Sequence, residues 1–171
     1  MESKTSAAIK RWYPVYTNPR AEKKTVEVLT DKGILTYLPL HRQLKQWSDR
    51  KKWVEEPFIK SYVFVNIAEH ERTSVLMTKG VSRFLYFSGK PASMPDRQIS
   101  ELKLLMASSL ELEITEEDLQ AGEKIIIKAG PLKGLTGEVV SRRSQKQLIV
   151  RLESIGCSII VHVAASFIER F

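Results

Sequence analysis

The 171-residue sequence has little cysteine and histidine. Its single cysteine, Cys157, cannot form an internal disulfide, and a lone cysteine more often packs as a small apolar residue than acts as a nucleophile. The histidines, His41, His70 and His162, stand in no metal-ligand spacing. We therefore expect no metal, no cofactor and no enzymatic activity.

Long apolar runs are also missing. The opening segment MESKTSAAIKRW lacks the apolar centre of a secretory signal, and no later stretch is apolar for the length of a membrane span. Hydrophobic residues make up 43% of the chain and charged residues 27%, the balance of a globular protein that can bury a core. We expect a cytoplasmic monomer with no membrane partner.

Glycine is scarce, with eight residues, yet three of them gather in KAGPLKGLTGEVV, Lys128 to Val140. They are Gly130, Gly134 and Gly137, and Pro131 follows the first. Glycine adopts positive φ at little cost and lets another backbone approach closely, while proline fixes φ in a turn. The stretch predicts a turn followed by a bulged strand start.

Acidic residues are outnumbered, since 27 Lys and Arg face 20 Asp and Glu, for a net charge of +7. Up to Leu110 there are 19 basic and 11 acidic residues, a net charge of +8, whereas from Glu111 onward there are 8 and 9, a net charge of −1. A basic excess suits a polyanion such as nucleic acid, and it equally serves solubility. The first part of the chain is the better candidate for nucleic-acid binding.

Strand and helix patterns alternate in this first part. RWYPVYT and ILTYLPL predict strands, separated by a helix that Asn18 opens as N-cap and that ends at Gly33. LKQWSDRKKWV predicts a hairpin, and SYVFVNI predicts a central strand, apolar on both faces. Helices over 69–78 and from 95 toward 106 flank the strand SRFLYF. The order predicts an α+β layer, one sheet with helices packed on it.

The second part is strand-like throughout. After the acidic segment LELEITEEDLQAGE come EKIIIK, LTGEVVSRR, QLIVRL, SIIVHV and SFIERF, all rich in β-branched residues. Five short strands favour a small closed barrel, because a flat sheet of that size would expose its edges. We expect an N-terminal domain over 10–109, an acidic linker over 110–120 and the barrel over 121–171.

Segments along the chain resemble, in order, the landmarks of the NusG family of transcription elongation factors. They are RWYPVYTNPRAEKK, FIKSYVFV, TKGVSRFLYF and GEKIIIKAGPLKGLTGEVV. The resemblance implies an antiparallel sheet with flanking helices, called NGN-like, followed by a KOW domain, an SH3-like barrel marked by Gly130, Gly134 and Gly137. It also implies a factor that binds RNA polymerase and suppresses pausing or termination. A KOW domain in this family can contact a small-subunit ribosomal protein or a termination factor.

One branch of the family looks most similar. GILTYLPLHRQLKQWSDRKKWVEEPFIKSYVFV resembles the UpxY-type antiterminators, which implies an operon-specific antiterminator for surface or capsular polysaccharide genes. A general NusG-type elongation factor is the alternative. Two rivals come from other classes: a ribosome-associated RNA-binding protein, which would bind RNA tightly without polymerase, and an adaptor that binds no nucleic acid.

The resemblance implies polymerase contacts at two places. The pocket that grips the clamp helices of the polymerase is matched by Tyr16, Ile59, Tyr62 and Phe64. The position that touches the opposite side of the polymerase cleft is matched by Arg72 and Thr73. Aromatic residues on half-buried strands are mostly core, and polar residues at a helix start mostly cap it, so a purely structural role is the alternative for each.

Nucleic-acid contacts are expected on two basic segments. By resemblance, the non-template DNA strand in the transcription bubble is met by Arg20, Lys23, Lys24, Thr78 and Lys79. In the predicted hairpin Arg50, Lys51 and Lys52 stand between Trp47 and Trp53, a mixture that can bind DNA or RNA by charge and stacking. A solvated helix face and ordinary cross-strand packing are the respective alternatives.

Overall fold

A computed structural model describes residues 8–142, 145–163 and 167–170 of the chain. The chain divides into two compact units, Met1–Asp96 and Arg97–Phe171. The first unit contains alternating strands and helices, and the second is rich in strands, as the sequence predicts for the two parts of the chain. Within the described residues no helix is both long enough and apolar enough to cross a membrane.

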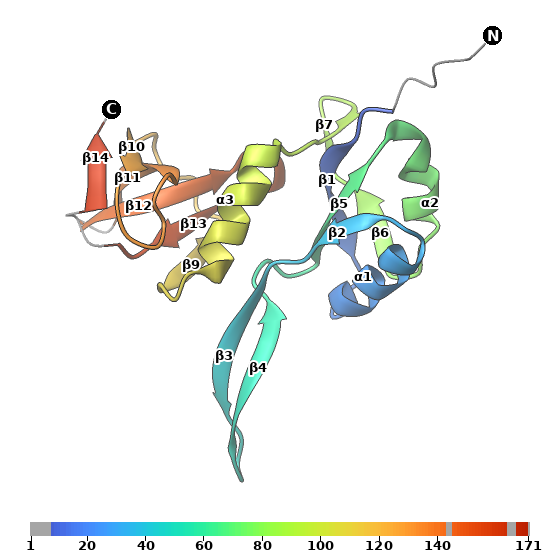
Figure 1. Ribbon diagram of the computed structural model, residues 1–171, viewed down its shortest axis with the longest axis horizontal. Coiled ribbons are helices and arrows are strands. Elements are labelled where there is room, and N and C mark those ends of the chain that lie inside the picture. Colours follow the sequence, from blue (N-terminus) through green and yellow to red (C-terminus); the bar gives the residue numbers. More distant parts are fainter. Residues whose placement is uncertain (1–7, 143–144, 164–166, 171) are drawn as a thin grey trace. The chain divides into compact units, whose positions relative to one another are not determined.

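A four-stranded antiparallel sheet forms the centre of the first unit, in the order β2-β5-β1-β6 (Figure 1). Its strands are β1 (Arg11–Thr17), β2 (Leu35–Tyr37), β5 (Tyr62–Ile67) and β6 (Val81–Phe84). The helical segments are α1 (Glu22–Asp31), the short 3₁₀ helix η1 (Glu69–Glu71) and α2 (Arg72–Leu76). Because β5 lies between β2 and β1, the prediction of a central strand at SYVFVNI is confirmed.

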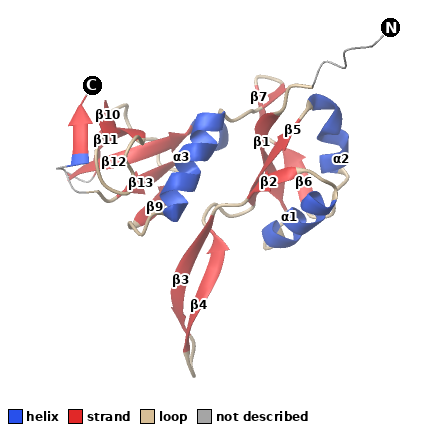
Figure 2. Cartoon of the chain, viewed as in Figure 1, coloured by secondary structure: helices blue, strands red, loops and turns tan. Residues whose placement is uncertain are grey.

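Two hairpins leave this sheet. The longer one pairs β3 (Leu40–Gln46) with β4 (Lys51–Pro57) as a separate two-stranded ribbon that projects from the first unit (Figures 1 and 2). The shorter one pairs β7 (Tyr86–Phe87) with β8 (Lys90–Pro91). The predicted hairpin is confirmed, and its strands are longer than the sequence pattern indicated.

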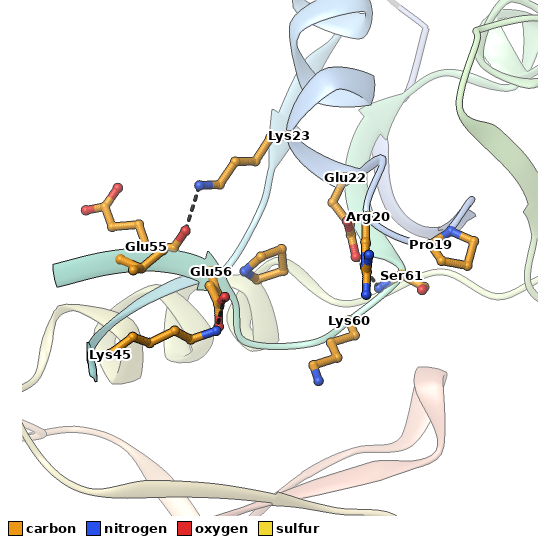
Figure 3. A pocket seen from close by; sticks show the side chains of 11 residues that line it. Pro19, Arg20, Glu22, Lys23, Lys45, Glu55, Glu56, Lys60 and Ser61 are labelled. Carbon is orange, nitrogen blue, oxygen red and sulfur yellow. Dashed lines mark hydrogen bonds and ion pairs between the residues drawn. The ribbon is translucent and has the colours of Figure 1, made fainter. Parts of the chain in front are cut away.

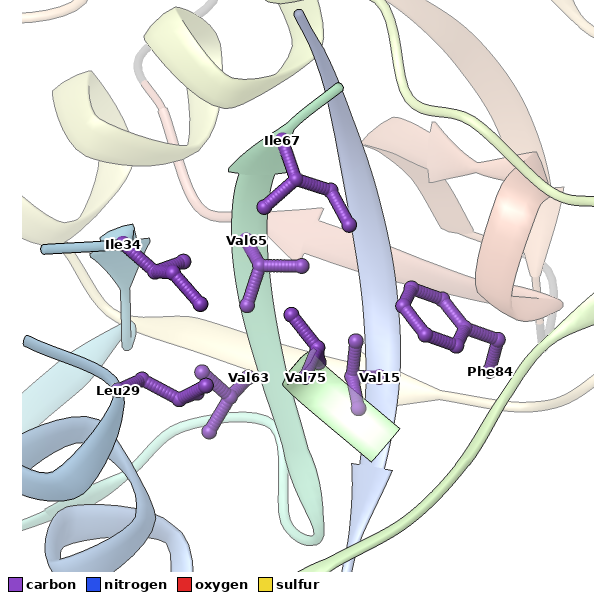
Figure 4. Packing of buried hydrophobic residues seen from close by; sticks show 8 residues of the cluster. All are labelled: Val15, Leu29, Ile34, Val63, Val65, Ile67, Val75 and Phe84. Carbon is purple, nitrogen blue, oxygen red and sulfur yellow. The ribbon is translucent and has the colours of Figure 1, made fainter. Parts of the chain in front are cut away.

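One face of the four-stranded sheet carries the aliphatic core of the first unit. The cluster joins β1, β5 and β6 to α1 and α2 (Figure 4) and consists of Val15, Leu29, Ile34, Val63, Val65, Ile67, Val75 and Phe84. Residues on alternate positions of a strand point to opposite faces, so Tyr62 and Phe64 of β5 lie on the other face. The two faces of this sheet therefore differ in chemistry.

The start of α1 differs from the prediction. The helix begins at Glu22 with Ala21 as its N-cap, not at Asn18. Arg20 has a φ of 62°, and this left-handed conformation ends any helical run from Asn18 onward. The other end agrees better, because α1 stops at Asp31 and Gly33 follows with a φ of 75°.

The second unit contains a six-stranded antiparallel sheet in the order β14-β10-β11-β12-β13-β9. Its elements are α3 (Asp96–Ala107), β9 (Leu112–Thr115), β10 (Glu123–Ile127), β11 (Thr136–Arg142), β12 (Gln145–Leu152), the 3₁₀ helix η2 (Glu153–Ile155), β13 (Cys157–Val161) and β14 (Ile168–Arg170). All five strands predicted for this part are present. Closure of the sheet into a barrel remains a prediction.

The expected linker over 110–120 is wrong in its central part. Residues Leu112–Thr115 form β9, which pairs with β13 at the edge of the sheet. By their spacing Glu111, Glu113 and Thr115 share one face of the strand, yet the first two are exposed and Thr115 is buried, so burial does not alternate along β9. The acidic composition and the missing alternation hid this strand in the sequence.

Helix α3 also falls on the other side of the expected boundary at 109. It belongs to the second unit apart from its first residue, Asp96. Arg97 and Glu101 both hydrogen-bond the hydroxyl of Thr136 on β11, at 2.6 and 2.9 Å, and Gln98 donates to the backbone carbonyl of Arg151 on β12 at 3.4 Å. These contacts attach the helix to the six-stranded sheet.

Candidate functional site

Two tyrosines face each other across the centre of the first sheet. Tyr16 on β1 is directly opposite Tyr62 on β5, and their ring centroids lie 4.4 Å apart. On the other side of β1, Tyr16 is paired with Arg83 of β6, whose guanidinium lies 4.8 Å from the centroid of the Tyr16 ring. Both tyrosines are half-buried, so part of each ring remains accessible. We call Tyr16, Tyr62 and Arg83 the tyrosine platform.

Arg83 was missed by the sequence analysis. It joins the platform because β6 pairs with β1, and that pairing links residues far apart in the sequence. A guanidinium over an aromatic ring is favourable and holds the ring in one orientation. The basic side chain is exposed, so its charge remains available at the edge of the platform.

Phe64 and Ile59, the other two residues predicted to form the pocket for the clamp helices, are buried. Phe64 is 0% exposed and Ile59 is 3% exposed, and the Phe64 ring lies 6.4 Å from that of Tyr37. Burial also raises the pKa of Tyr37 to about 12. Side chains this deep pack within the structure, and their expected part in the pocket that grips the clamp helices stays a prediction.

Arg72 and Thr73 begin α2 and differ in how firmly they are held. Arg72 donates to the carboxylate of Glu69 at 3.3 Å and to the hydroxyl of Tyr86 at 3.0 Å, and its guanidinium lies 5.7 Å from the ring centroid of Phe84. Thr73 is exposed. The arginine is therefore fixed in place by neighbours within the first unit, while the threonine is open to a partner.

Most of the predicted DNA contacts are exposed and come from two segments that touch. Arg20, Lys23 and Lys24 lie at or near the start of α1, and Lys79 follows α2. Gly80 brings the segments together: it has a φ of 95°, and a Cβ there would lie 2.2 Å from Oγ1 of Thr25 on α1. Its carbonyl also accepts the backbone N–H of Asn18 at 2.9 Å. Only glycine allows this approach.

Thr78 does not belong to this exposed group. It is 3% exposed, its hydroxyl donates to the carbonyl of Ser74 at 2.8 Å, and it accepts from Nζ of Lys32 at 2.8 Å. The hydroxyl of Thr78 thus both donates and accepts a hydrogen bond at the C-terminal end of α2. The expected DNA contact at Thr78 is therefore wrong for this side chain, and its neighbour Lys79 carries the exposed charge.

The β3–β4 hairpin presents the remaining predicted basic residues. Arg50, Lys51 and Lys52 are all exposed. The turn is closed by a hydrogen bond from the backbone N–H of Trp47 to the carbonyl of Arg50 at 2.8 Å. Trp47 is 54% exposed and Trp53 is 58% exposed, which is unusual for the largest apolar side chain.

A pocket of about 630 Å³ lies where the base of this hairpin meets the start of α1 (Figure 3). Glu22 is 6% exposed and accepts the backbone N–H of Ser61 at 2.8 Å, while Nζ of Lys23 donates to the carbonyl of Glu55 at 2.6 Å. The remaining lining residues include Arg20, Lys45, Val54, Glu56 and Lys60. Basic and acidic side chains alternate here, so the pocket has no single sign of charge.

The clustered glycines of the second unit have two distinct tasks. Gly130 and Gly134 have φ values of 79° and 90° in the turn between β10 and β11, which confirms the predicted turn. Gly137 lies within β11, where a Cβ would lie 2.6 Å from the carbonyl oxygen of Ile149 on β12. The close neighbour is confirmed, but the expected bulge is absent, because β11 pairs in continuous register with both adjacent strands.

Cys157 has no catalytic environment. It is 9% exposed, and burial raises the pKa of its thiol to about 12. The thiol stays protonated at neutral pH, and the protonated form is a poor nucleophile. This agrees with its interpretation as a packed apolar residue.

The model of the family described as "Transcription termination factor nusG" matches residues 10–103. The chain therefore belongs to the NusG family. This is a family of transcription factors, not of enzymes.

Similar solved structures cover nearly the whole chain. A structure described as domain interaction in Thermotoga maritima NusG matches with a TM-score of 0.51 and 20% identity, over 95% of this chain and 97% of that one. Two structures of the MjSpt4:Spt5 complex, conformations A and B, match with TM-scores of 0.30 and 0.28 at 16% identity, over 94% and 93% of this chain and 97% and 95% of theirs. The Thermotoga match supports a NusG-like fold for the chain.

Proposed function

We propose that the chain is a transcription elongation factor that grips the clamp helices of RNA polymerase with its tyrosine platform and suppresses pausing and termination. The observation that carries this proposal is the contact of Tyr16 with Tyr62 on the sheet face opposite the aliphatic core. Two rigid aromatic rings offer apolar contact area with few rotamers to freeze, which suits the tip of a helical pair. Arg83 adds a positive charge for an acidic residue of the partner.

Arg72 and Thr73 are proposed as a second contact, across the polymerase cleft. The bonds of Arg72 to Glu69 and Tyr86 would present Thr73 at a fixed position. A factor that holds both sides of a cleft binds the closed polymerase better than the open one. Such a difference in affinity shifts the polymerase toward elongation without any catalysis by the factor.

The exposed basic residues of α1 and its neighbouring loop are proposed to meet the non-template DNA strand. The close approach at Gly80 supports this, because it places the loop of Lys79 beside the helix that bears Lys24. Arg20 and Lys23 extend the same basic group toward the hairpin. Phosphate contacts of this kind add affinity that falls as salt rises.

The finer assignment is an operon-specific antiterminator for surface or capsular polysaccharide genes, acting in the cytoplasm. It is supported by the UpxY-like stretch that contains the β3–β4 hairpin. The six-stranded sheet of the second unit is proposed to be the KOW barrel, with a ribosomal protein or a termination factor as its partner. A general NusG-type elongation factor is the second candidate, supported by the family match.

The test is transcription by a reconstituted elongation complex on two templates, one with a capsular polysaccharide leader and one without. We expect the protein to bind the polymerase and reduce pausing, and Tyr62→Ala to abolish both effects. Read-through confined to the polysaccharide leader would support the operon-specific factor, and equal read-through on both templates the general one. Undiminished binding by Tyr62→Ala would contradict the platform, and tight RNA binding without polymerase would favour the ribosomal alternative.

A further inference from the structure

The two faces of the β3–β4 hairpin are not equivalent. The register pairs Arg42 with Glu55, Leu44 with Trp53 and Gln46 with Lys51, so these six side chains share one face. The other face carries the pairs His41 with Glu56, Gln43 with Val54 and Lys45 with Lys52. We call the first the tryptophan face and the second the lysine face. Figure 3 shows Glu55 and Glu56 on opposite sides of β4, as this alternation requires.

Residues of the lysine face contact other residues of the first unit. Lys45 pairs with the carboxylate of Glu56 at 2.5 Å, and this hydrogen bond lowers the pKa of Glu56. Lys45, Val54 and Glu56 also line the pocket beside α1. This face therefore borders the proposed DNA-binding residues, and one of its two lysines, Lys45, is already ion-paired.

The tryptophan face is open, and its two cations, Arg42 and Lys51, outnumber its one carboxylate, Glu55. Trp53 is 58% exposed and Leu44 is 49% exposed, although they lie side by side across the ribbon. The guanidinium of Arg42 lies 5.6 Å from the centroid of the Trp53 ring. Neither Arg42 nor Lys51 has a carboxylate partner in the described part of the chain. An exposed indole flanked by cations matches the requirements of a base-stacking site.

We infer that the tryptophan face is a second nucleic-acid site, which stacks a base of single-stranded RNA on Trp53 while Arg42 and Lys51 hold the adjacent phosphates. Duplexes hide their bases from such a ring, so the ligand is single-stranded. The exposed carboxylate of Glu55 lies two residues from Trp53 on the same face and accepts a hydrogen bond from a ribose 2′-hydroxyl, which DNA lacks. The choice of RNA rests on the proposed function, since nascent RNA is the other single strand that an elongation complex exposes.

The structure also separates two residues that the sequence analysis grouped together. Lys51 lies on the tryptophan face and Lys52 on the lysine face, although both are exposed. They have the same charge and are neighbours in the chain. Lys52→Ala is therefore a matched control for Lys51→Ala, and Trp47→Ala, in the turn, is a control for Trp53→Ala.

The experiment titrates the full chain with a single-stranded RNA of about 12 nucleotides and follows tryptophan fluorescence. In the Trp47→Phe variant the remaining tryptophans are Trp53 and Trp12, and Trp12 is only 6% exposed, so quenching reports stacking on Trp53. We expect quenching by RNA, weaker binding of DNA of the same sequence, and little binding of duplex RNA. Because Trp53→Ala removes the reporting tryptophan, the variants are titrated by the fluorescence anisotropy of labelled RNA; Trp53→Ala should weaken RNA binding about tenfold, and Lys51→Ala should weaken it more than Lys52→Ala.

Several outcomes would overturn the inference: equal effects of Lys51→Ala and Lys52→Ala, no effect of Trp53→Ala, or preference for DNA. Because Trp53 is exposed, its replacement should leave the circular dichroism spectrum unchanged, which excludes unfolding as the cause of a loss. The titration needs no polymerase, so it separates this site from the proposed function. RNA binding through Trp53 by a chain that ignores polymerase would uphold the site and refute the clamp proposal, and the reverse result would refute only the site.

Discussion

Residues that alternate along the short strand β5 differ in burial and in contacts between its two faces. Val63, Val65 and Ile67 are each 0% exposed and pack with α1 and α2. Tyr62 on the opposite face is half-buried and touches Tyr16. Under the proposed function these adjacent residues serve stability and binding separately, so single substitutions should separate the two properties.

The largest expected effect is on stability, from Ile67→Ala. Removing a buried aliphatic side chain loses transfer free energy and leaves a cavity, together about 3 kcal/mol. Asn66→Ala, on the neighbouring position and the opposite face, should cost less than about 1 kcal/mol. Urea unfolding followed by the fluorescence of Trp12, which lies on β1, measures both variants. Equal losses would mean that the two faces do not differ in this way.

The next effect is on binding, from Tyr62→Ala. A central aromatic residue of an interface typically contributes about 2 kcal/mol or more, so affinity for the polymerase should fall about 30-fold. Tyr62→Phe keeps the ring and should retain most of the affinity. Affinity is measured with the purified clamp domain in a titration. A Tyr62→Ala variant that loses stability as Ile67→Ala does, with unchanged affinity when folded, would assign Tyr62 to the core.

Much of the fold could be predicted from local patterns. Apolar and β-branched runs located β1, β5 and five of the six strands of the second part, and Gly130 with Pro131 and Gly134 indicated the turn, where both glycines have positive φ. The failures arose where local signals conflict. Asn18 and Pro19 carry the chemistry of a helix start, but the chain turns at Arg20, and the acidic residues around β9 concealed an edge strand.

The candidate site was harder to predict because it depends on pairing and depth. The period-two geometry of a strand puts Tyr62 and Phe64 on one face, but it cannot show that Phe64 is fully buried while Tyr62 is partly open. Arg83 joins the platform only through the β1–β6 pairing. Lys51 and Lys52 lie on opposite faces because β4 already begins at Lys51, and the sequence pattern did not show where that strand begins.

A smaller effect should distinguish Lys79 from its neighbour Thr78. Lys79 is exposed and Thr78 is 3% exposed with its hydroxyl bonded twice. Each lost contact to single-stranded DNA lowers the slope of log affinity against log salt by about 0.7, so the double variant Lys24→Ala with Lys79→Ala should lower it by about 1.4. Thr78→Val should leave the slope unchanged and reduce stability. An unaltered slope in the double variant would remove these lysines from the DNA surface.

The smallest expected effect is on the unfolding free energy and its dependence on pH, from Glu71→Gln. Glu69, two residues earlier in the chain, provides the control. Glu71 accepts the backbone N–H of Ala68 at 2.8 Å, and this bond, with a smaller contribution from Lys10, holds the pKa of Glu71 below its usual value. A lowered folded-state pKa stabilises the protein above the unfolded-state pKa, and that stability is lost as pH falls through the folded-state value. Glu71→Gln should cost roughly 0.5 kcal/mol at neutral pH, as loss of a capping bond does, and should flatten the dependence of unfolding free energy on pH below about 4.5. Glu69→Gln, whose side chain is 88% exposed, should leave the unfolding free energy at neutral pH nearly unchanged, and an equal loss of free energy in both variants would show that the Ala68 bond is not the cause.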